Sequence, residues 1–83
     1  MSKTIPLHLQ YFALFREQAG KSQESLDLPV TTAQELYAYL QAHYGFSLDA
    51  KLLKVSINEN FAPLEQSLSP GDRVVFIPPV AGG

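Results

Sequence analysis

The sequence has 83 residues, of which 46% are hydrophobic, and a formal net charge of −2. A chain of this length predicts one compact domain with little room for an enclosed active-site cavity, which argues against a self-sufficient enzyme. The six Lys and Arg residues are spread singly, which argues against nucleic acid as a partner, and without cysteine the chain has no disulfide, thiolate metal site or cysteine nucleophile.

The N-terminal segment carries neither an unbroken apolar stretch nor a small-residue cleavage site, and no segment of the sequence approaches the length of a membrane span. We therefore expect a cytoplasmic protein with no membrane partner. Residues 5–13 alternate in polarity, as in a half-buried strand. Residues 14–20 break the alternation and predict one short helical turn or loop, and residues 23–28 predict a second strand, antiparallel to the first.

The clearest local signal is a capping box at Thr32 and Glu35, in which the threonine hydroxyl accepts from the Glu35 amide and the glutamate reaches back. It predicts a helix over residues 33–44, ended by Gly45. The apolar stripe expected on this helix consists of Leu36, Tyr39, Leu40 and either His43 or Tyr44.

The second half of the chain predicts three more strands. Residues 53–57 alternate, residues 58–60 are typical of a turn, and residues 61–62 suit a small edge strand. After a turn at residues 70–72, the apolar and mostly β-branched residues 73–77 predict a strand buried on both faces.

The element order β-β-α-β-β-β indicates an α+β protein of ubiquitin-like β-grasp fold. Its last strand would lie beside and parallel to the first in a mixed sheet, with one main helix packed on one face. A ferredoxin-like fold is the alternative, but it needs a second long helix that the sequence does not clearly supply. We divide the chain into a β-grasp domain, residues 1–77, and a flexible C-terminal tail, residues 78–83, ending in Gly-Gly.

The tail is the most informative segment. Two prolines stiffen its start, and Ala81, Gly82 and Gly83 lack bulk, so the tail forms a thin filament that can enter a narrow partner channel. Val80 is the last side chain large enough to anchor in a groove. An ordinary frayed terminus is the alternative interpretation.

Other candidate sites are weak. His8 and His43 have no metal-ligand partners at a suitable spacing, the carboxylates are scattered, and no phosphate-binding loop occurs, so we expect no metal and no directly bound cofactor. By strand parity, Phe12, Val75 and Ile77 should point away from the helix. We predict that Phe12, Phe61 and Ile77 form a partly exposed partner-binding patch.

The chain resembles the small subunits of molybdopterin synthase. The resemblance covers nearly the whole length and rests on Phe12-Ala13 followed by Arg16-Glu17 and Gly20, on Leu68 followed by Gly71-Asp72, and on the ending Pro-Pro-Val-Ala-Gly-Gly. It implies a sulfur carrier of molybdenum cofactor biosynthesis, a sulfur-donating subunit that is active only with the large synthase subunit. Gly83 would carry the reacting carboxyl group, and Gly82 and Ala81 would provide clearance.

The resemblance also implies the partners. A ubiquitin-activating-like adenylating enzyme would use ATP on the terminal carboxylate, and a sulfur donor protein would convert the acyl-adenylate into a thiocarboxylate. The carrier would then dock on the large subunit, in a heterotetramer, and deliver sulfur to a cyclic pyranopterin. Two alternatives stay open: the sulfur carrier of thiamine thiazole synthesis, and a ubiquitin-like modifier or passive binding module.

Overall fold

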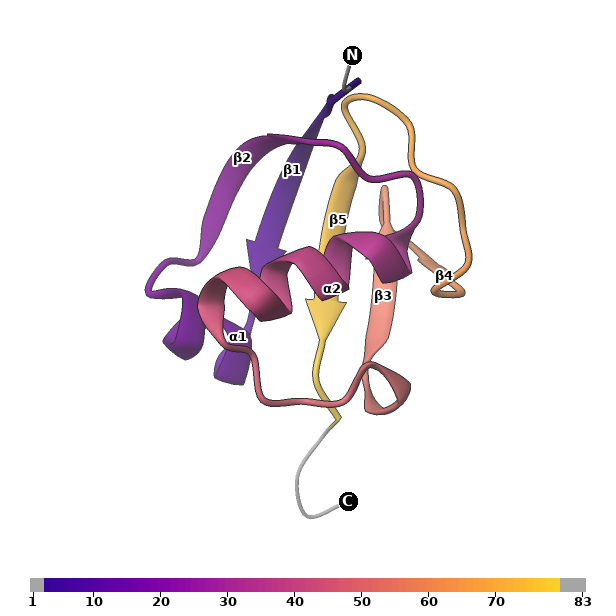
Figure 1. Ribbon diagram of the computed structural model, residues 1–83. Coiled ribbons are helices and arrows are strands. Elements are labelled where there is room, and N and C mark those ends of the chain that lie inside the picture. The colour runs from indigo at the N-terminus through magenta and orange to yellow at the C-terminus, as the bar shows by residue number, and fades with distance from the viewer. Residues whose placement is uncertain (1–2, 80–83) are drawn as a thin grey trace.

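The computed structural model describes residues 3–79. From one edge to the other, its sheet contains β2 (Gln23–Leu28), β1 (Ile5–Tyr11), β5 (Arg73–Ile77), β3 (Lys54–Ile57) and β4 (Asn60–Ala62). Strands β1 and β5 run parallel, the other neighbours are antiparallel, and helix α2 (Ala33–Tyr44) crosses one face (Figure 1). The predicted α+β class and β-grasp layout are therefore confirmed, with β5 between β1 and β3.

The first hairpin agrees with the sequence pattern, except at the end of β1. Leu7, Leu9 and Tyr11 are buried on the face toward α2, while His8 is exposed on the opposite face. The strand ends at Tyr11, two residues earlier than predicted. At Ala13 the backbone has a φ of 48°, a left-handed conformation that breaks the extended run.

The segment after β1 forms a helix, α1 (Ala13–Ala19), of seven residues rather than the predicted single turn or loop. Phe12 stands at its N-cap and makes no side-chain capping bond, so the sequence carries no start signal there. Phe15 anchors the helix, because its ring is fully buried against the rings of Tyr37, Phe46 and Phe76.

Helix α2 has the predicted bounds, and its cap differs in one bond. Thr32 Oγ1 accepts from the Glu35 amide at 3.2 Å, as expected. Glu35 Oε1, however, accepts from the amide and the hydroxyl of Thr31, at 2.8 and 2.9 Å. Gly45 ends the helix with a φ of 75°.

The buried stripe of α2 also differs from the prediction. Its buried residues are Ala33, Leu36, Tyr37 and Leu40, and Tyr39 is 40% exposed on the solvent side. The helix is therefore turned so that Tyr37, rather than Tyr39, packs on the sheet. The hydroxyl of Tyr37 donates to the Leu48 carbonyl at 2.6 Å, so the buried tyrosine keeps a polar partner.

The second half contains a 3₁₀ helix, η1 (Ala50–Leu52), that the sequence did not predict. Strand β4 lies at the sheet edge, as predicted. The prediction that the last strand is buried on both faces was wrong: Val74 and Phe76 are buried under α2, but Val75 and Ile77 are only half-buried. Helix α2 covers one face of β5, and no second layer of residues 3–79 covers the other (Figure 1).

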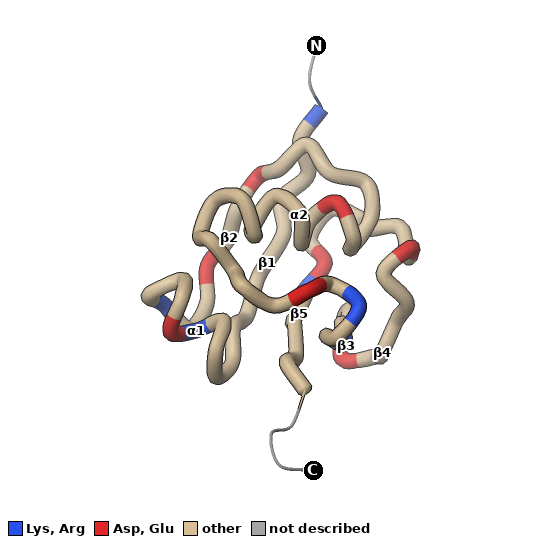
Figure 2. Tube along the Cα trace, turned by 60° about the horizontal axis from the view of Figure 1, so that its bottom comes forward, with Lys and Arg blue, Asp and Glu red and all other residues tan. Residues whose placement is uncertain are grey.

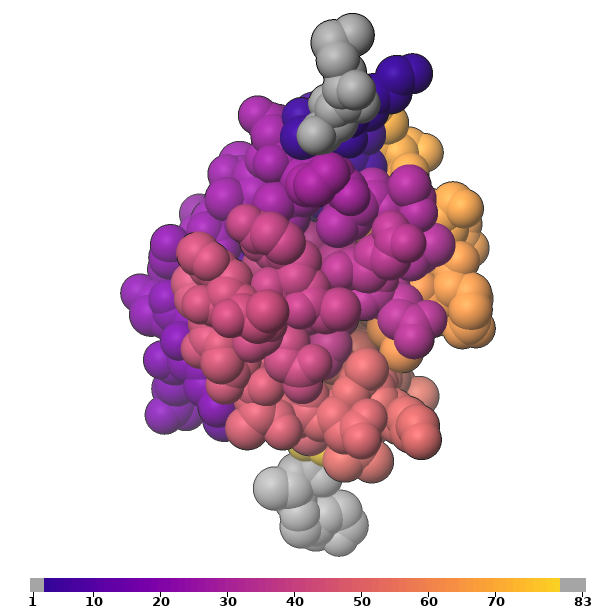
Figure 3. Space-filling view, viewed as in Figure 1, coloured from indigo at the N-terminus to yellow at the C-terminus, as the bar shows by residue number. Residues whose placement is uncertain are grey.

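The core lies between α2 and the inner face of the sheet, with Leu7, Leu9, Leu36, Leu40 and Val74 almost fully buried. Viewed from the side of α2, the yellow of β5 is nearly hidden by the helix and its flanking segments (Figure 3). The strand that leads into the C-terminal tail is therefore anchored in the middle of the domain.

Candidate functional site

The candidate site is the sheet face that points away from α2, called here the outer face. The strand register places Gln10, Val75, Ser56 and Phe61 in one row across β1, β5, β3 and β4. Neighbouring strands lie about 4.8 Å apart, so Val75 and Phe61 are separated by about 10 Å. One step toward the tail, Ile77 lies opposite Lys54 on the same face.

The three residues of the predicted patch are all accessible on this side of the molecule. Phe61 is 75% exposed, Phe12 is 44% exposed and Ile77 is half-buried. Because Tyr11 pairs with Phe76, Phe12 follows β1 at the level where Ile77 ends β5. Phe12 and Ile77 thus lie at the end of the sheet from which the tail leaves, and Phe61 lies one row before that end, at the sheet edge. Whether a partner covers them stays a prediction.

A shallow groove of about 510 Å³ runs beside Phe61. Its lining is mostly apolar and consists of Leu53, Lys54, Val55, Phe61, Ala62, Pro63 and Leu64. Lys54 brings the groove into contact with the end of β5, since Lys54 is paired with Ile77. The groove therefore shares Phe61 with the patch and reaches the strand position next to Ile77.

The residues assigned to the chemistry lie outside the described part of the chain. These are Val80, Ala81, Gly82 and Gly83. Of the predicted tail, the structure describes Pro78, which is half-buried, and Pro79, which is exposed. The position of Ile77 at the end of a central strand fixes where the tail begins.

The other half of the outer face is polar. In the row next to Gln10, Ser25, His8 and Arg73 lie side by side on β2, β1 and β5, and His8 Nδ1 is 2.9 Å from Ser25 Oγ. His43 lies elsewhere, stacked on Tyr39 on the solvent side of α2. Among residues 3–79, no three His, Asp or Glu side chains are grouped so that they could hold a metal ion.

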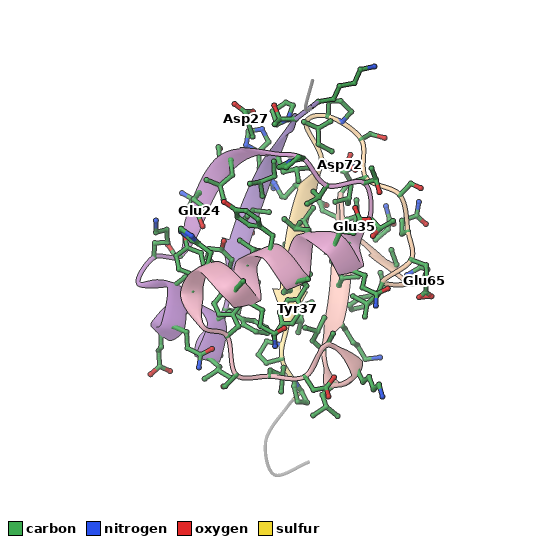
Figure 4. The ribbon with its side chains drawn as sticks, in the orientation of Figure 1. Glu24, Asp27, Glu35, Tyr37, Glu65 and Asp72 are labelled. Atoms are coloured by element: carbon green, nitrogen blue, oxygen red, sulfur yellow. The ribbon has the colours of Figure 1, made fainter. Side chains whose placement is uncertain are left out.

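A polar cluster that sequence reasoning missed closes the edge of the core between β2 and α2. Glu24 Oε2 accepts hydrogen bonds from the hydroxyls of Tyr11 and Tyr44, each at 2.5 Å, and Lys21 lies 3.3 Å from Oε1 (Figure 4). Burial raises the pKa of Glu24, but the bonds from Tyr11, Tyr44 and Lys21 outweigh it and hold this pKa below its usual value. Burial and the Glu24 carboxylate raise the pKa of Tyr11.

No pattern in the sequence would reveal this cluster, because its members come from β1, the loop before β2, β2 itself and the end of α2. The only hint is the parity of Glu24, which pairs with Leu9 and must therefore face the core. The cluster lies on the side of the sheet opposite the outer face, so its role is to hold the fold together.

Comparison with known proteins identifies the family of this chain. The ThiS family profile matches residues 9–83. The chain belongs to the ThiS family. Relatives in this family include the molybdopterin synthase sulfur carrier subunit of Haemophilus influenzae, which is 32% identical over 93% of this chain and 99% of its own. The protein of the same name from Mycobacterium tuberculosis is 33% identical over 95% of this chain and 99% of its own.

Solved structures agree on the fold. The Haloferax volcanii HVO 2177 protein is 28% identical, with a TM-score of 0.81 over 96% of this chain and 88% of its own. Subunit 1 in the complex of subunits 1 and 2 of the Helicobacter pylori molybdopterin-converting factor is 24% identical, with a TM-score of 0.63 over 95% of this chain and all of its own. In this ThiS-family chain, no helix within residues 3–79 has the length and apolarity needed to cross a membrane.

Proposed function

We propose that this protein is a sulfur carrier of molybdenum cofactor biosynthesis. In this function the C-terminal thiocarboxylate of Gly83 donates sulfur to a cyclic pyranopterin precursor within molybdopterin synthase. The observation that carries the proposal is the family: relatives 32% and 33% identical, matched almost end to end, are molybdopterin synthase sulfur carrier subunits. The family profile supports it as well, because its match over residues 9–83 includes both the domain and the tail.

The fold supports this proposal through the placement of β5. This strand is held by β1 on one side and by β3 on the other; it ends at the level of the exposed Phe12, and the exposed Phe61 lies two strands away on the same face. A partner that covers these aromatic side chains would therefore meet the tail at its base. In this arrangement the partner binds the domain, and the reaction takes place in the partner.

The chemistry explains why partners are needed. A free carboxylate is a poor electrophile, and adenylation supplies a leaving group, which a sulfur nucleophile then displaces to give the thiocarboxylate. The proposed partners are a ubiquitin-activating-like adenylating enzyme that binds the ATP, a sulfur donor protein, and the large synthase subunit, with two copies of each subunit in a heterotetramer. Gly82 and Ala81 would keep the filament thin, and Val80 would anchor it.

The relatives' names support the large subunit as a partner, since each is called a subunit of molybdopterin synthase. The Helicobacter pylori structure shows a protein of this fold in complex with subunit 2 of its own factor. We extend that pairing to this chain as part of the proposal.

The test is reconstitution with the cognate adenylating enzyme, a sulfur source and the large subunit. Wild-type protein should gain the mass of one oxygen-to-sulfur replacement and then convert the pyranopterin precursor. Deleting Gly83, or adding one glycine after it, should abolish both steps, since misplacement by about 1 Å can cost a hundredfold in rate. Gly82→Val should slow them by widening the filament.

A serine added before Lys3 is the matched control, because it lengthens the opposite end of the domain and should leave both steps unchanged. Wild-type rates in the Gly83 deletion or in the extended variant would overturn the proposal in favour of a passive binding module. Sulfur transfer to a thiazole precursor, and none to the pyranopterin, would instead identify the carrier of thiamine synthesis.

A further inference from the structure

The acidic residues of this chain are absent from four of the five strands, a separation of charges that the net charge of −2 does not reveal. Strands β1, β5, β3 and β4 contain no Asp or Glu. Of the two acids in the sheet, both on β2, Glu24 faces the core, and Asp27 points outward beside Pro6, in the row next to His8 and two strands away from β5. Figure 4 shows the other labelled carboxylates, Glu35, Glu65 and Asp72, on α2 and on the segment before β5.

Three basic side chains point from these acid-free strands to the outer face. His8 and Arg73 lie side by side on β1 and β5, and Lys54 lies beside Ile77. Within residues 3–79 the salt bridge that forms, between Lys21 and Glu24, lies on the other side of the sheet. Arg73 and Lys54 are thus exposed cations that form no salt bridge with any carboxylate of residues 3–79.

The surroundings of Arg73 suit recognition of a carboxylate. A depression of about 580 Å³ surrounds it, and His8, Gln10, Gln23 and Ser25 contribute polar groups to the same lining. Glu24 also reaches this lining, but its carboxylate is occupied by Tyr11, Tyr44 and Lys21. A guanidinium in such a position binds a planar carboxylate through two parallel hydrogen bonds.

The distribution of the cations also indicates what kind of partner fits. Lys54 borders the apolar groove, and Arg73 lies one strand away from it, so the cations flank an apolar strip rather than line a basic track. Figure 2 shows that the Lys and Arg positions do not gather into one stripe, as a nucleic-acid backbone would require. An apolar centre with charged residues at its rim is typical of a protein–protein interface.

We propose that the large synthase subunit docks on the outer face through an acidic surface, with carboxylates opposite Arg73 and Lys54. This inference rests on the proposed function and adds the chemistry of the partner to it. Charges at the rim of an interface mainly steer association and set its register, so their effect should appear in the association rate and depend on salt.

The test measures binding of the cognate large subunit to Arg73→Glu and Lys54→Glu, at low ionic strength and in about 1 M salt, where the screening length is about 3 Å. Each reversal should lower affinity at least tenfold at low salt, mostly through slower association, and the loss should shrink in high salt. Arg73→Lys should lose less than Arg73→Glu, because it keeps the charge. Melting temperatures of all variants exclude unfolding as the cause.

Lys3→Glu is the matched control, because it makes the same charge change in the segment before β1, away from the end of the sheet at which the tail leaves, and should change affinity less than twofold. Equal losses in Lys3→Glu and Arg73→Glu would show a general charge effect and overturn the inference. So would normal binding of both outer-face reversals, or reversals that impair only adenylation. If the wild-type protein forms a thiocarboxylate and binds the large subunit, those results leave the sulfur-carrier function intact. If it does neither, both proposals fail.

Discussion

Glu24 is the residue on which the edge between β2 and α2 depends. Two tyrosine hydroxyls, from Tyr11 and Tyr44, donate to the same carboxylate oxygen, and the Glu24 side chain is only 11% exposed. Replacing Glu24 by Gln removes the negative charge of the group that accepts both hydrogen bonds. A hydrogen bond to a charged acceptor contributes about 2 kcal/mol to the free energy of unfolding. We expect Glu24→Gln to lower the free energy of unfolding by about that amount, measured by urea denaturation.

The control for this substitution is Glu17→Gln, which removes a carboxylate that is exposed on α1. Exposed substitutions of this kind usually change stability by less than about 0.5 kcal/mol. Equal effects of the two substitutions would contradict the role assigned to the cluster.

The same carboxylate predicts a pH dependence. Hydrogen bonds hold the pKa of Glu24 below its ordinary value of 4.5, so its contribution to stability is complete above that value. The contribution is lost as the pH falls through the lowered pKa. The difference in unfolding free energy between wild type and Glu24→Gln should therefore stay constant from neutral pH down to the ordinary carboxyl range, and then shrink. A difference that does not change in acid would contradict this.

At the scale of elements, the turn of the β3–β4 hairpin has a strained backbone, and a glycine substitution can relieve this strain. Its two turn residues, Asn58 and Glu59, have φ values of 52° and 73°. Two-residue hairpin turns with both φ values positive favour Asn followed by Gly. Glu59→Gly should therefore stabilise the protein by about 0.5 to 1 kcal/mol, seen as a higher urea midpoint at unchanged slope.

Asn58 tests the same turn in the opposite direction. Its side chain donates to Asp72 Oδ1 at 2.9 Å and accepts from the Arg73 amide at 3.0 Å, which ties the hairpin to the start of β5. Asn58→Gly relieves the backbone but removes both bonds, so we expect a net loss of about 1 kcal/mol. If both Glu59→Gly and Asn58→Gly stabilised the protein, the backbone strain alone would determine the stability of this turn.

The elements also show what the sequence could and could not predict. The bounds of β2, α2 and β5 follow from local signals: an alternating pattern, a capping threonine and a β-branched run. Helix α1 was underestimated because Phe12 gives no capping signal. Tyr39 was placed in the core because a helical stripe can be read in two phases, and only packing on the sheet selects Tyr37. The Glu24 cluster joins distant segments, so no local pattern contains it.

At the scale of the whole molecule, two exposed aromatic residues lie on opposite sides. Phe12 is 44% exposed beside the outer face, and Tyr39 is 40% exposed on the solvent side of α2. Truncating a buried interface anchor typically costs about 2 kcal/mol or more. We expect Phe12→Asp to weaken binding of both the large subunit and the adenylating enzyme at least tenfold, measured by titration calorimetry.

Tyr39→Asp introduces the same charge at a similar exposure and should leave both affinities unchanged. Circular dichroism should show that both variants keep the native fold. Wild-type affinity of Phe12→Asp for both partners would remove this residue from the docking surface.

The parallel pairing of β1 and β5 has a mechanical consequence. Strand β1 begins at one end of the sheet and β5 finishes at the other (Figure 1), so tension applied between the two chain ends pulls these neighbours past each other. The hydrogen bonds between them are then loaded in shear and must break together, whereas an antiparallel hairpin pulled at its open end unzips one bond at a time. A partner that draws on the tail would thus meet a stiff anchor. Single-molecule stretching from the two ends should give a higher rupture force than stretching across the β1–β2 hairpin.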